Sequence, residues 1–256
     1  MKITILGSGS YQPEYRRHSA SHLVQIGEQN LVFDFGRGVL DQLQKSGVEY
    51  HQIDKIFISH LHSDHWSEIA PFLHIALAEP STNKLRKKDV SIYGPVGFKR
   101  AYNQVLSAFD LKKFNPKYKV KVVELKNNSV IKGTSWTVKA FLVKHSSSLN
   151  CLAFRLTSAE KNFAYSGDTG DCPGLRNACH QADLAIVETS WPKKLKPTGH
   201  LTGELVGQMA TQEKIKKLVC THMTPYYLKN YNVKKIVKKY YKGPVIMAKD
   251  LLIINV

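Results

Sequence analysis

Three histidines and an aspartate fall within six consecutive residues of this chain. They are His60, His62, Asp64 and His65, in the pattern His-x-His-x-Asp-His. Imidazole and carboxylate groups are ligands of borderline metals such as zinc. With the histidine content of this chain, such an arrangement arises by chance in about one chain in a thousand, well below the false-positive level of most short motifs. The segment therefore predicts a metal site that the rest of the fold has to complete.

The flanking residues predict how this motif is held. Residues 55–59 form a short apolar run typical of a buried strand, and residues 66–77 have the spacing of a helix with one apolar face. His60 and His62 are two apart in extended chain, so both can point to one side and bind one ion. The last two members of the motif then turn toward a second position beside it. The alternative is a solvated polar turn that is rich in histidine by accident.

Three further candidates each follow an apolar run typical of a strand. They are His145, Asp168 and His222. Taken alone, a histidine or aspartate at a strand end is more typical of a structural or turn residue. Here, however, His60 and His62 already supply two ligands for one ion. A third protein ligand would complete the set and leave an open position for water. The repeated placement at strand ends predicts a sheet core flanked by helices, with the site in a cleft at one edge.

The motif, its setting between strand and helix, and these three later residues resemble the metallo-β-lactamase fold superfamily, and within it the ribonuclease Z-like hydrolases. The resemblance covers nearly the whole chain. It implies one α/β domain over residues 1–256, a four-layer αββα sandwich with the metal site at one edge of the two sheets. Asp34-x-Gly36 is similar to the Asp-Cys-Gly element of that family, which implies that Asp34 holds the nearby loop together without binding metal.

The resemblance also implies a dinuclear site. The expected ligands of the first ion are His60, His62 and His145, and those of the second ion are Asp64, His65 and His222. Asp168 is expected to bridge the two ions. The expected cofactors are two divalent ions, Zn²⁺ first, with Mn²⁺ or Fe²⁺ as alternatives. Two such ions can share a hydroxide, so water would be the nucleophile. The absence of cysteine ligands favours an open catalytic site over a closed structural one.

A histidine outside the ligand set separates branches of this superfamily. His200-Leu201-Thr202 resembles the His-Ser-Thr-like element of ribonuclease Z-like phosphodiesterases, with Leu in place of Ser. This implies that His200 neutralises a phosphoryl oxygen or protonates the leaving alkoxide. Asp64 and His200 are therefore the expected catalytic residues. Because a lactone has less need of such a group, the sequence favours a phosphodiester.

The expected activity is that of a metal-dependent hydrolase, a dinuclear zinc phosphodiesterase that acts through a metal-bound hydroxide. Many ribonuclease Z proteins carry a long Gly/Pro-rich arm for tRNA between the equivalents of His145 and Asp168, and only 22 residues lie between them here. The expected substrate is thus a small phosphodiester, a cyclic nucleotide or a short RNA. Two alternatives stay open. One is a lactone or thioester hydrolase on the same scaffold, and the other is a basic nucleic-acid-binding protein with a structural metal.

The charge balance is the unusual feature of the composition. The 37 Lys+Arg against 20 Asp+Glu give a net charge of +17, which favours anionic partners, nucleic acid included. Most of these cations are lysines, which lack the planar fork of arginine, so a compositional bias explains the surplus equally well. Residues 79–89, which are rich in Lys and Arg, form either a phosphate-facing loop or a solvated one.

A helix predicted over residues 228–242 concentrates part of this charge. Its expected inward residues are Val233, Ile236, Val237 and Tyr240, and its expected outward residues are Lys234, Lys235, Lys238 and Lys239. This face is either an interaction surface or a solvated one.

The remaining expectations concern the environment of the protein. The N-terminal apolar stretch is too short for a signal peptide, and no apolar run approaches the ~20 residues of a membrane span. The four cysteines show no Cys-x-x-Cys pairing and are expected to be reduced thiols, at Cys151, Cys172, Cys179 and Cys220. These features predict a cytoplasmic protein without a membrane partner. The oligomeric state stays open, a homodimer included.

Overall fold

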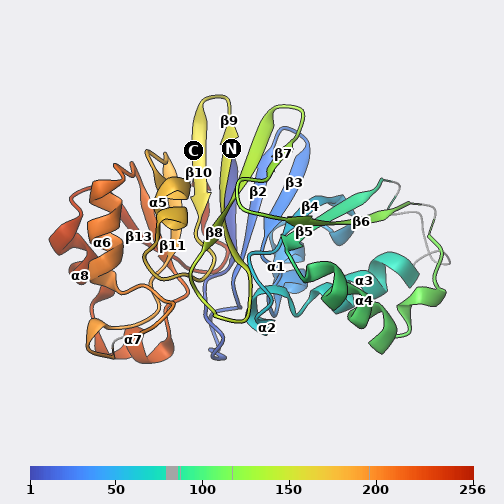
Figure 1. Ribbon diagram of the computed structural model, residues 1–256, viewed down its shortest axis with the longest axis horizontal. Coiled ribbons are helices and arrows are strands. Elements are labelled where there is room, and N and C mark those ends of the chain that lie inside the picture. The colour runs from blue at the N-terminus through green and yellow to red at the C-terminus, as the bar shows by residue number, and fades with distance from the viewer. Residues whose placement is uncertain (79–85, 87, 117, 196) are drawn as a thin grey trace.

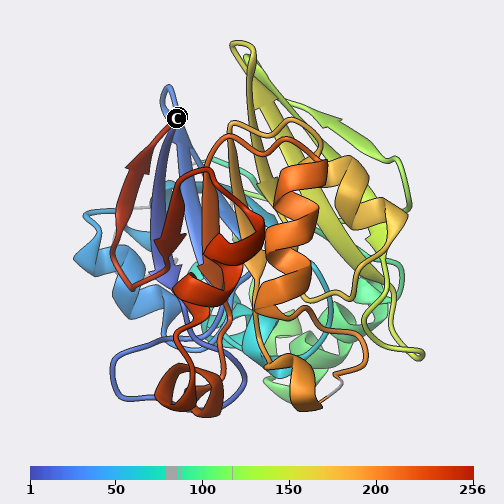
Figure 2. The same ribbon diagram turned by 90° about the vertical axis from the view of Figure 1, so that its left-hand side faces the viewer.

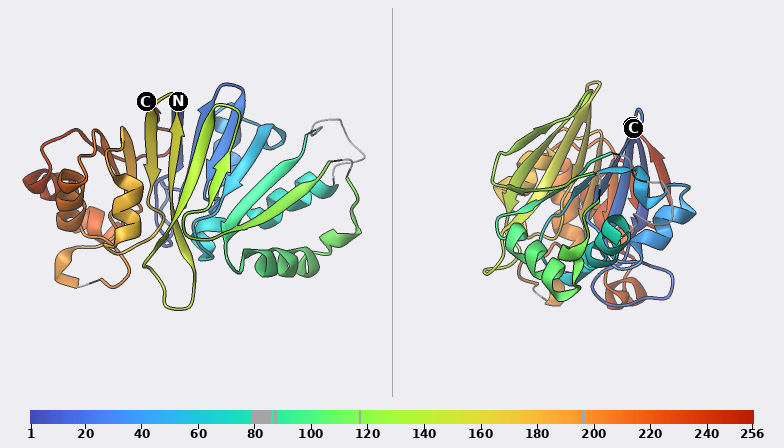
Figure 3. Two further views of the ribbon diagram at one scale, coloured as in Figure 1. Left: turned by 45° about the horizontal axis from the view of Figure 1, so that its top comes forward. Right: turned by 90° about the vertical axis from the view of Figure 1, so that its right-hand side faces the viewer.

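Two β-sheets face each other in the centre of the molecule, and helices cover the outer face of each (Figure 1). The structure is a computed structural model, and it describes residues 1–78, 86, 88–116, 118–195 and 197–256. The left-hand view in Figure 3 shows the same succession of helices, sheet, sheet and helices. The predicted four-layer αββα sandwich is confirmed.

The first sheet comes almost entirely from the N-terminal half of the chain. Its strands are β1 (Lys2–Gly7), β2 (Ser21–Ile26), β3 (Gln29–Phe33), β4 (Ile53–Phe57), β5 (Val90–Pro95), β6 (Val120–Leu125) and β14 (Ile253–Asn255). They lie in the order β14-β1-β2-β3-β4-β5-β6. Pairing is antiparallel from β14 to β3 and parallel from β3 to β6.

The second sheet repeats this mixture. Its strands are β7 (Val130–Lys132), β8 (Trp136–Val143), β9 (Cys151–Ser158), β10 (Lys161–Tyr165), β11 (Leu184–Glu188), β12 (Leu218–Thr221) and β13 (Val245–Met247). They lie in the order β13-β12-β11-β10-β9-β8-β7, parallel from β13 to β10 and antiparallel from β10 to β7. The three-residue strands β13 and β14 were not predicted, because so short a segment carries no periodicity of its own.

The helices divide between the two outer faces. They are α1 (Val39–Lys45), α2 (Ser63–Trp66), α3 (Ile69–Ala78), α4 (Phe98–Ala108), α5 (Pro173–Cys179), α6 (Gly203–Gln212), α7 (Pro225–Asn230) and α8 (Val233–Tyr240), with short 3₁₀ turns η1 (Tyr50–Gln52), η2 (Leu111–Lys113) and η3 (Lys193–Leu195). Buried residues of α1, α3 and α4 pack on the first sheet, and those of α5, α6 and α8 pack on the second. In Figure 2, α6 and α8 lie side by side over the second sheet.

The C-terminal helix differs from its prediction. Residues 228–242 do not form one helix, because the backbone is extended at Tyr231. A new helix, α8, begins at Val233, and the side chain of Asn232 caps it by accepting a hydrogen bond from the amide of Lys235. Such a cap supplies a partner for an amide that the helix itself leaves unpaired. Tyr240 is 40% exposed, so its predicted inward position is wrong.

Two predictions about basic residues also change. Lys238 is half-buried, and its Nζ donates to the carbonyls of Lys242 and Gly243 at 3.0 Å, so it completes the end of α8 rather than facing solvent. In the basic segment, residues 79–85 and 87 lie outside the described residues. Arg86 is buried, and its guanidinium donates to backbone carbonyls, among them that of Ile53 at 2.6 Å. Arg86 is therefore a structural residue and not a phosphate ligand.

The cysteines are buried free thiols. Burial raises the pKa of Cys179 and of Cys220 to about 12, so neither is a reactive thiolate near neutral pH. Among the described helices, none has both the length and the apolar character needed to cross a bilayer.

The space between the sheets is filled by aromatic rings. Phe33 and Phe57, at the ends of neighbouring strands, stack at 5.0 Å, and Phe154 of the opposite sheet lies 5.7 Å from each. Because side chains alternate along a strand, Val32 and Ile56 point the other way, into the layer of α1 and α3.

Replacing Phe154 by Ala tests this core. The change should lower the free energy of unfolding by about 3–5 kcal/mol, because it removes a fully buried ring and leaves a cavity between the sheets. Urea unfolding followed by circular dichroism measures the loss. Phe109→Ala is the matched control, since Phe109 is 59% exposed and its loss should change stability by less than about 0.5 kcal/mol. Equal losses in the two variants would contradict this description of the core.

Candidate metal centre

The predicted ligands meet at one edge of the sandwich. The histidine motif follows the end of β4, and His145, Asp168 and His222 follow the ends of β8, β10 and β12. In Figure 1 this is the lower edge, where α2 lies, and both chain ends lie at the opposite edge. The expectation that strand ends bring the candidates together is confirmed.

Three imidazoles form the first group of possible donors. His62 Nδ1 lies 3.0 Å from His60 Nε2 and 2.9 Å from His145 Nε2. All three donor atoms fall within 4.8 Å of one another. Ligands of a tetrahedral Zn²⁺ at 2.0–2.1 Å are about 3.3–3.4 Å apart, so these spacings fit a shared cation.

The second group combines two imidazoles with two carboxylates, at Asp64, His65, Asp168 and His222. All four residues are buried, and their donor atoms again lie within 4.8 Å of one another. His222 Nε2 lies 3.3 Å from His65 Nε2 and 3.1 Å from Asp64 Oδ2. Six of the seven residues thus lie in the two groups of three that the sequence resemblance implies, and Asp168, the expected bridge, lies with the second group.

Asp168 stands between the two groups. Its Oδ1 is 3.3 Å from the Nε2 atoms of both His65 and His222, and its Oδ2 is 3.9 Å from His145 Nε2. Although Oδ1 is buried, it accepts no hydrogen bond from any described residue. A buried carboxylate oxygen without a hydrogen bond requires another partner, and a cation shared with these imidazoles would supply it.

A buried carboxylate behind the motif orients two of its histidines. Asp34 Oδ2 accepts hydrogen bonds from His65 Nδ1 at 2.6 Å and from Ser59 Oγ at 2.8 Å. Ser59 Oγ in turn lies 3.0 Å from His60 Nδ1. Asp34 Oδ1 accepts from the Ser59 amide, so the residue also holds the loop, as the resemblance implies.

Glu188 plays the same part on the second sheet, and sequence reasoning missed it. This buried residue ends β11, and its Oε1 accepts from His200 Nδ1 at 2.8 Å. Its Oε2 accepts from Ser190 Oγ at 2.7 Å, which lies 3.0 Å from His222 Nδ1. The signal was present, because a carboxylate at the end of an apolar run is the pattern that identified Asp168.

These contacts give the histidines a common orientation. His60, His65, His145 and His222 each direct Nδ1 to an oxygen outside the centre and turn Nε2 toward it. Partners of this kind fix the tautomer and the ring orientation of metal-binding histidines. For His145 the partner is the carbonyl of Gly199, at 2.8 Å. A Cβ at residue 199 would lie 2.1 Å from the His145 carbonyl oxygen, so only glycine permits this approach.

The charges of the centre favour a cation. Burial, together with the charge of His65, lowers the pKa of His60, which keeps its imidazole neutral. Burial would also lower the pKa of His65, but the carboxylates of Asp168, Asp34 and Asp64 outweigh it and raise that pKa well above its usual value. Buried carboxylates require compensating positive charge, and metal ions are one source of it.

His200 lies next to the first group. Its ring centroid is 4.7 Å from that of His145, and it shares a possible donor set with His145 and Asp168. Burial would lower the pKa of His200, but the hydrogen bond and charge of Glu188 outweigh this and raise it to about 9. The predicted catalytic histidine is therefore in the centre, and its environment favours the charged imidazolium.

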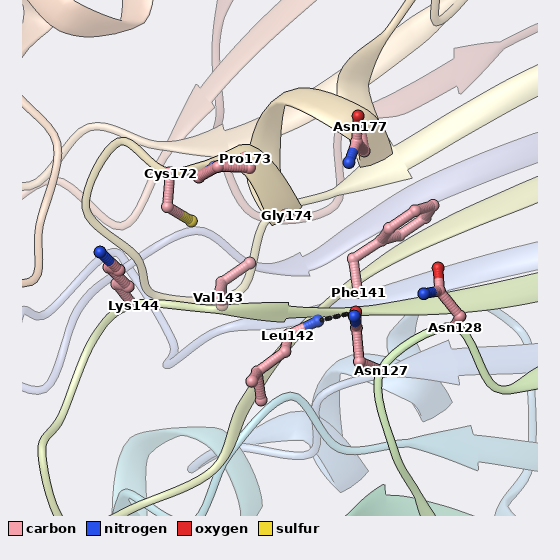
Figure 4. Close-up of a pocket in the computed structure, with 10 residues that line it drawn as sticks. All are labelled: Asn127, Asn128, Phe141, Leu142, Val143, Lys144, Cys172, Pro173, Gly174 and Asn177. Atoms are coloured by element: carbon pink, nitrogen blue, oxygen red, sulfur yellow. Dashed lines mark hydrogen bonds between the residues drawn. The ribbon is translucent and has the colours of Figure 1, made fainter.

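Solvent-filled space adjoins the centre at the loop that carries His145. A hollow of about 500 Å³ is lined by residues of this loop and by Gly170, Asp171 and Gly199. A second one, of about 270 Å³, lies farther along β8 and is drawn in Figure 4. There Asn127 accepts a hydrogen bond from the Leu142 amide, and α5 begins at Pro173. The second hollow contains none of the histidines, so only the first of these two hollows adjoins the centre.

Comparisons with known proteins agree with this arrangement. A family model described as beta-lactamase superfamily domain matches residues 29–223. The chain belongs to this superfamily. Ribonuclease Z of Methanosarcina acetivorans is 26% identical over 306 aligned positions, which cover 98% of this chain and 97% of that protein. The chain is thus a metallo-β-lactamase-like metal hydrolase with distant, full-length homology to ribonuclease Z.

Solved metallo-β-lactamase structures share the whole architecture. The metallo-beta-lactamase fold protein YhfI from Bacillus subtilis superimposes with a TM-score of 0.83 at 21% identity, covering 99% of each chain. The short form of human tRNase Z gives a TM-score of 0.80 at 24% identity, covering 100% of this chain and 99% of that one. These likenesses extend the fold assignment to both sheets and their helices.

Metal content tests the centre directly. We expect about two divalent ions per folded chain after incubation with Zn²⁺ or Mn²⁺, and fewer in Asp168→Ala, because that carboxylate lies between both groups. Elemental analysis after desalting measures the ratio. Asp171→Ala is the matched control, since this exposed carboxylate three residues away contacts Arg176 instead. A ratio near zero in the metal-replete wild type would refute the site.

Proposed function

We propose that the protein is a dinuclear zinc phosphodiesterase that acts on a small phosphodiester, a cyclic nucleotide or a short RNA. The observation that supports this most is the position of His200, an imidazole hydrogen-bonded to buried Glu188 beside two groups of metal donors. Phosphoryl transfer needs positive charge where the phosphate oxygens and the leaving oxygen develop negative charge. The distant homology to ribonuclease Z also favours a phosphodiester.

In this proposal the two donor groups are the metal ligands. His60, His62 and His145 would hold one ion, and Asp64, His65 and His222 would hold the other, with the Asp168 carboxylate close to both groups. When bound, two such ions would supply an activated water and neutralise charge on the phosphoryl oxygens. Asp34 and Glu188 keep the imidazoles in position.

His200 supplies the proton in this proposal. Glu188 accepts the Nδ1 hydrogen, which leaves Nε2 as the nitrogen that can donate to substrate. As water attacks phosphorus and the bond to the leaving oxygen breaks, Nε2 gives its proton to that oxygen. Glu188 is a positioning residue, because it acts through His200 and through Ser190.

The length of the chain between the ligands favours a small substrate. The residues between His145 and Asp168 are used by a short loop and by the hairpin of β9 and β10. The alignment with the Methanosarcina ribonuclease Z is 306 positions long, although this chain has only 256 residues, so at least 50 positions have no counterpart here. A short oligonucleotide or cyclic nucleotide needs no long docking arm between these two ligands.

The donor chemistry supports catalysis over a structural metal. Neither donor group contains cysteine, and a hollow of about 500 Å³ reaches His145. Structural zinc sites are closed and are commonly built from cysteine, whereas catalytic sites leave a position open.

His200→Ala should lower the turnover of a phosphodiester by about 100-fold or more, the usual effect of removing an acid or a charge stabiliser. The metal content should stay at the wild-type value. If His200 is a proton donor, the loss should shrink for bis-p-nitrophenyl phosphate, whose leaving group needs no proton. If it stabilises charge, good and poor leaving groups should be affected alike. Steady-state kinetics on diesters of both kinds separates these cases.

His180→Ala is the matched control for that experiment. His180 also pairs with a glutamate, Glu213, but it is exposed and lies on a different part of the chain. Its loss should leave turnover near wild type. Full activity of His200→Ala on every diester, or loss of metal from this variant, would contradict the assigned role. Faster hydrolysis of a lactone than of any diester by the wild type would favour the lactonase alternative.

The basic face of α8 should contribute to binding of a polyanion but not to chemistry. Replacing exposed Lys234, Lys235 and Lys239 together by Gln should weaken RNA binding and reduce the slope of log affinity against log salt by up to about 2. Lys238 is left intact because it caps the helix. Turnover of bis-p-nitrophenyl phosphate should not change.

A charge-matched variant controls this measurement. Lys2, Lys45 and Lys132 are exposed and lie on other elements, so their joint replacement by Gln removes the same charge without altering α8. Equal effects of the two triple variants would assign the RNA affinity to net charge rather than to the face of α8.

A further inference from the structure

A hollow of about 300 Å³ lies between the metal-binding motif and α4. It is separate from the hollow at His145, although the two share Leu149 and Asn150. Its main lining residues are Leu61, Val96, Arg100, Gln104, Ser148 and Asn150. Because Leu61 stands between His60 and His62, the hollow begins at the metal-binding loop itself.

The walls of this hollow are held by specific contacts. The indole nitrogen of Trp66 donates to the carbonyl of Leu61 at 3.0 Å, and the Trp66 ring packs edge-on against Phe98, the first residue of α4, at 6.0 Å. On the other side, the side-chain Nδ2 of Asn150 donates to the carbonyl of Val96 at 3.3 Å. The motif, α4 and the loop after His145 are thus linked around one space.

Arg100 is the group in this hollow that suits an anion. It is exposed, and it forms no hydrogen bond or ion pair with any residue that the structure describes, whereas Arg155 and Arg176 are engaged by carbonyls or carboxylates. The start of α4 does not compete for the same ligand. Glu124 already accepts hydrogen bonds from the amides of Gly97 and Lys99.

We propose that this hollow is a substrate subsite in which Arg100 binds a second phosphate, next to the phosphodiester that is cleaved. The assignment rests on the proposed phosphodiesterase function. The planar guanidinium matches two phosphate oxygens at once, which a lysine does not. Leu61, Val96 and Leu149 give the sugar or base that separates the two phosphates an apolar wall. Gln104 and Ser148 add polar groups at the rim.

The second phosphate could be internal to an oligonucleotide or could be a terminal monophosphate. Both present at least two non-bridging oxygens that a guanidinium can bind, so the chemistry of the subsite is shared. Four substrates separate the possibilities. Bis-p-nitrophenyl phosphate and the dinucleotide ApA carry one phosphate, the trinucleotide ApApA carries a second internal phosphate, and pApA carries a terminal one.

The test compares kcat/KM of the metal-loaded wild type with Arg100→Gln and Lys99→Gln. Lys99 is the matched control, because it is the neighbouring exposed cation on α4 and does not line the hollow. Arg100→Gln should lower kcat/KM by about 10-fold or more, mainly through KM, on ApApA, pApA or both, as expected for losing a charged hydrogen bond. On the two single-phosphate substrates, and for Lys99→Gln on all four, changes should stay within about twofold.

The pattern across substrates decides the outcome. A loss confined to ApApA assigns an internal phosphate, and a loss confined to pApA assigns a terminal one. Arg100→Lys should recover only part of the activity, because it restores the charge without the fork. Equal losses on all four substrates, or no loss on any, would overturn the subsite alone. If the wild type hydrolyses none of the four diesters, the proposed function fails and the subsite fails with it.

Discussion

The close approach of buried imidazoles and carboxylates at one edge of the sandwich is the constraint on which the rest of the structure depends. Desolvating such groups is costly unless each finds a partner, so every element around them has to supply one. Each sheet does so through a carboxylate behind the centre. Asp34 follows β3 of the first sheet, and Glu188 ends β11 of the second. On both sides a serine, Ser59 or Ser190, donates a hydrogen bond to the carboxylate and also lies beside the Nδ1 atom of a histidine.

Two residues of the centre also have an unusual backbone conformation. Asp34 and His222 both have positive φ, 58° and 59°, a conformation that residues other than glycine rarely adopt. Both follow buried strands directly, and backbone hydrogen bonds to adjacent segments of the same chain hold them in place. The Asp34 amide donates to the carbonyl of Phe57, and the His222 amide to that of Ser8. Such strain persists only where the surroundings over-determine it, and here the packed sheets do so.

The sequence predicted what is local and missed what depends on contacts between distant segments. The motif at His60 and the runs before His145 and His222 identified both the strands and their ends. The run before His222 is unbroken because β12 is buried on both faces, whereas β8, before His145, alternates between buried and more exposed residues. Glu188 escaped because its role requires His200 and His222 to be near it in space. Arg86 was misread since a buried arginine that donates to carbonyls has the same local sequence as a solvated one.

The substrate range of such a centre is set by the connections between strands, not by the ligands. Two ions at the strand ends would act on any ester that reaches them, so discrimination depends on what stands beside the open coordination positions. In this chain the loop after His145 is short, and it separates two hollows rather than extending as an arm. In the functions proposed above, Arg100 in the hollow beside α4 and His200 beside His145 are the side chains that contact phosphate oxygens. Under the proposed function, selection for a substrate with a second phosphate would then depend on Arg100 and on the short loop, with the metal ligands unchanged.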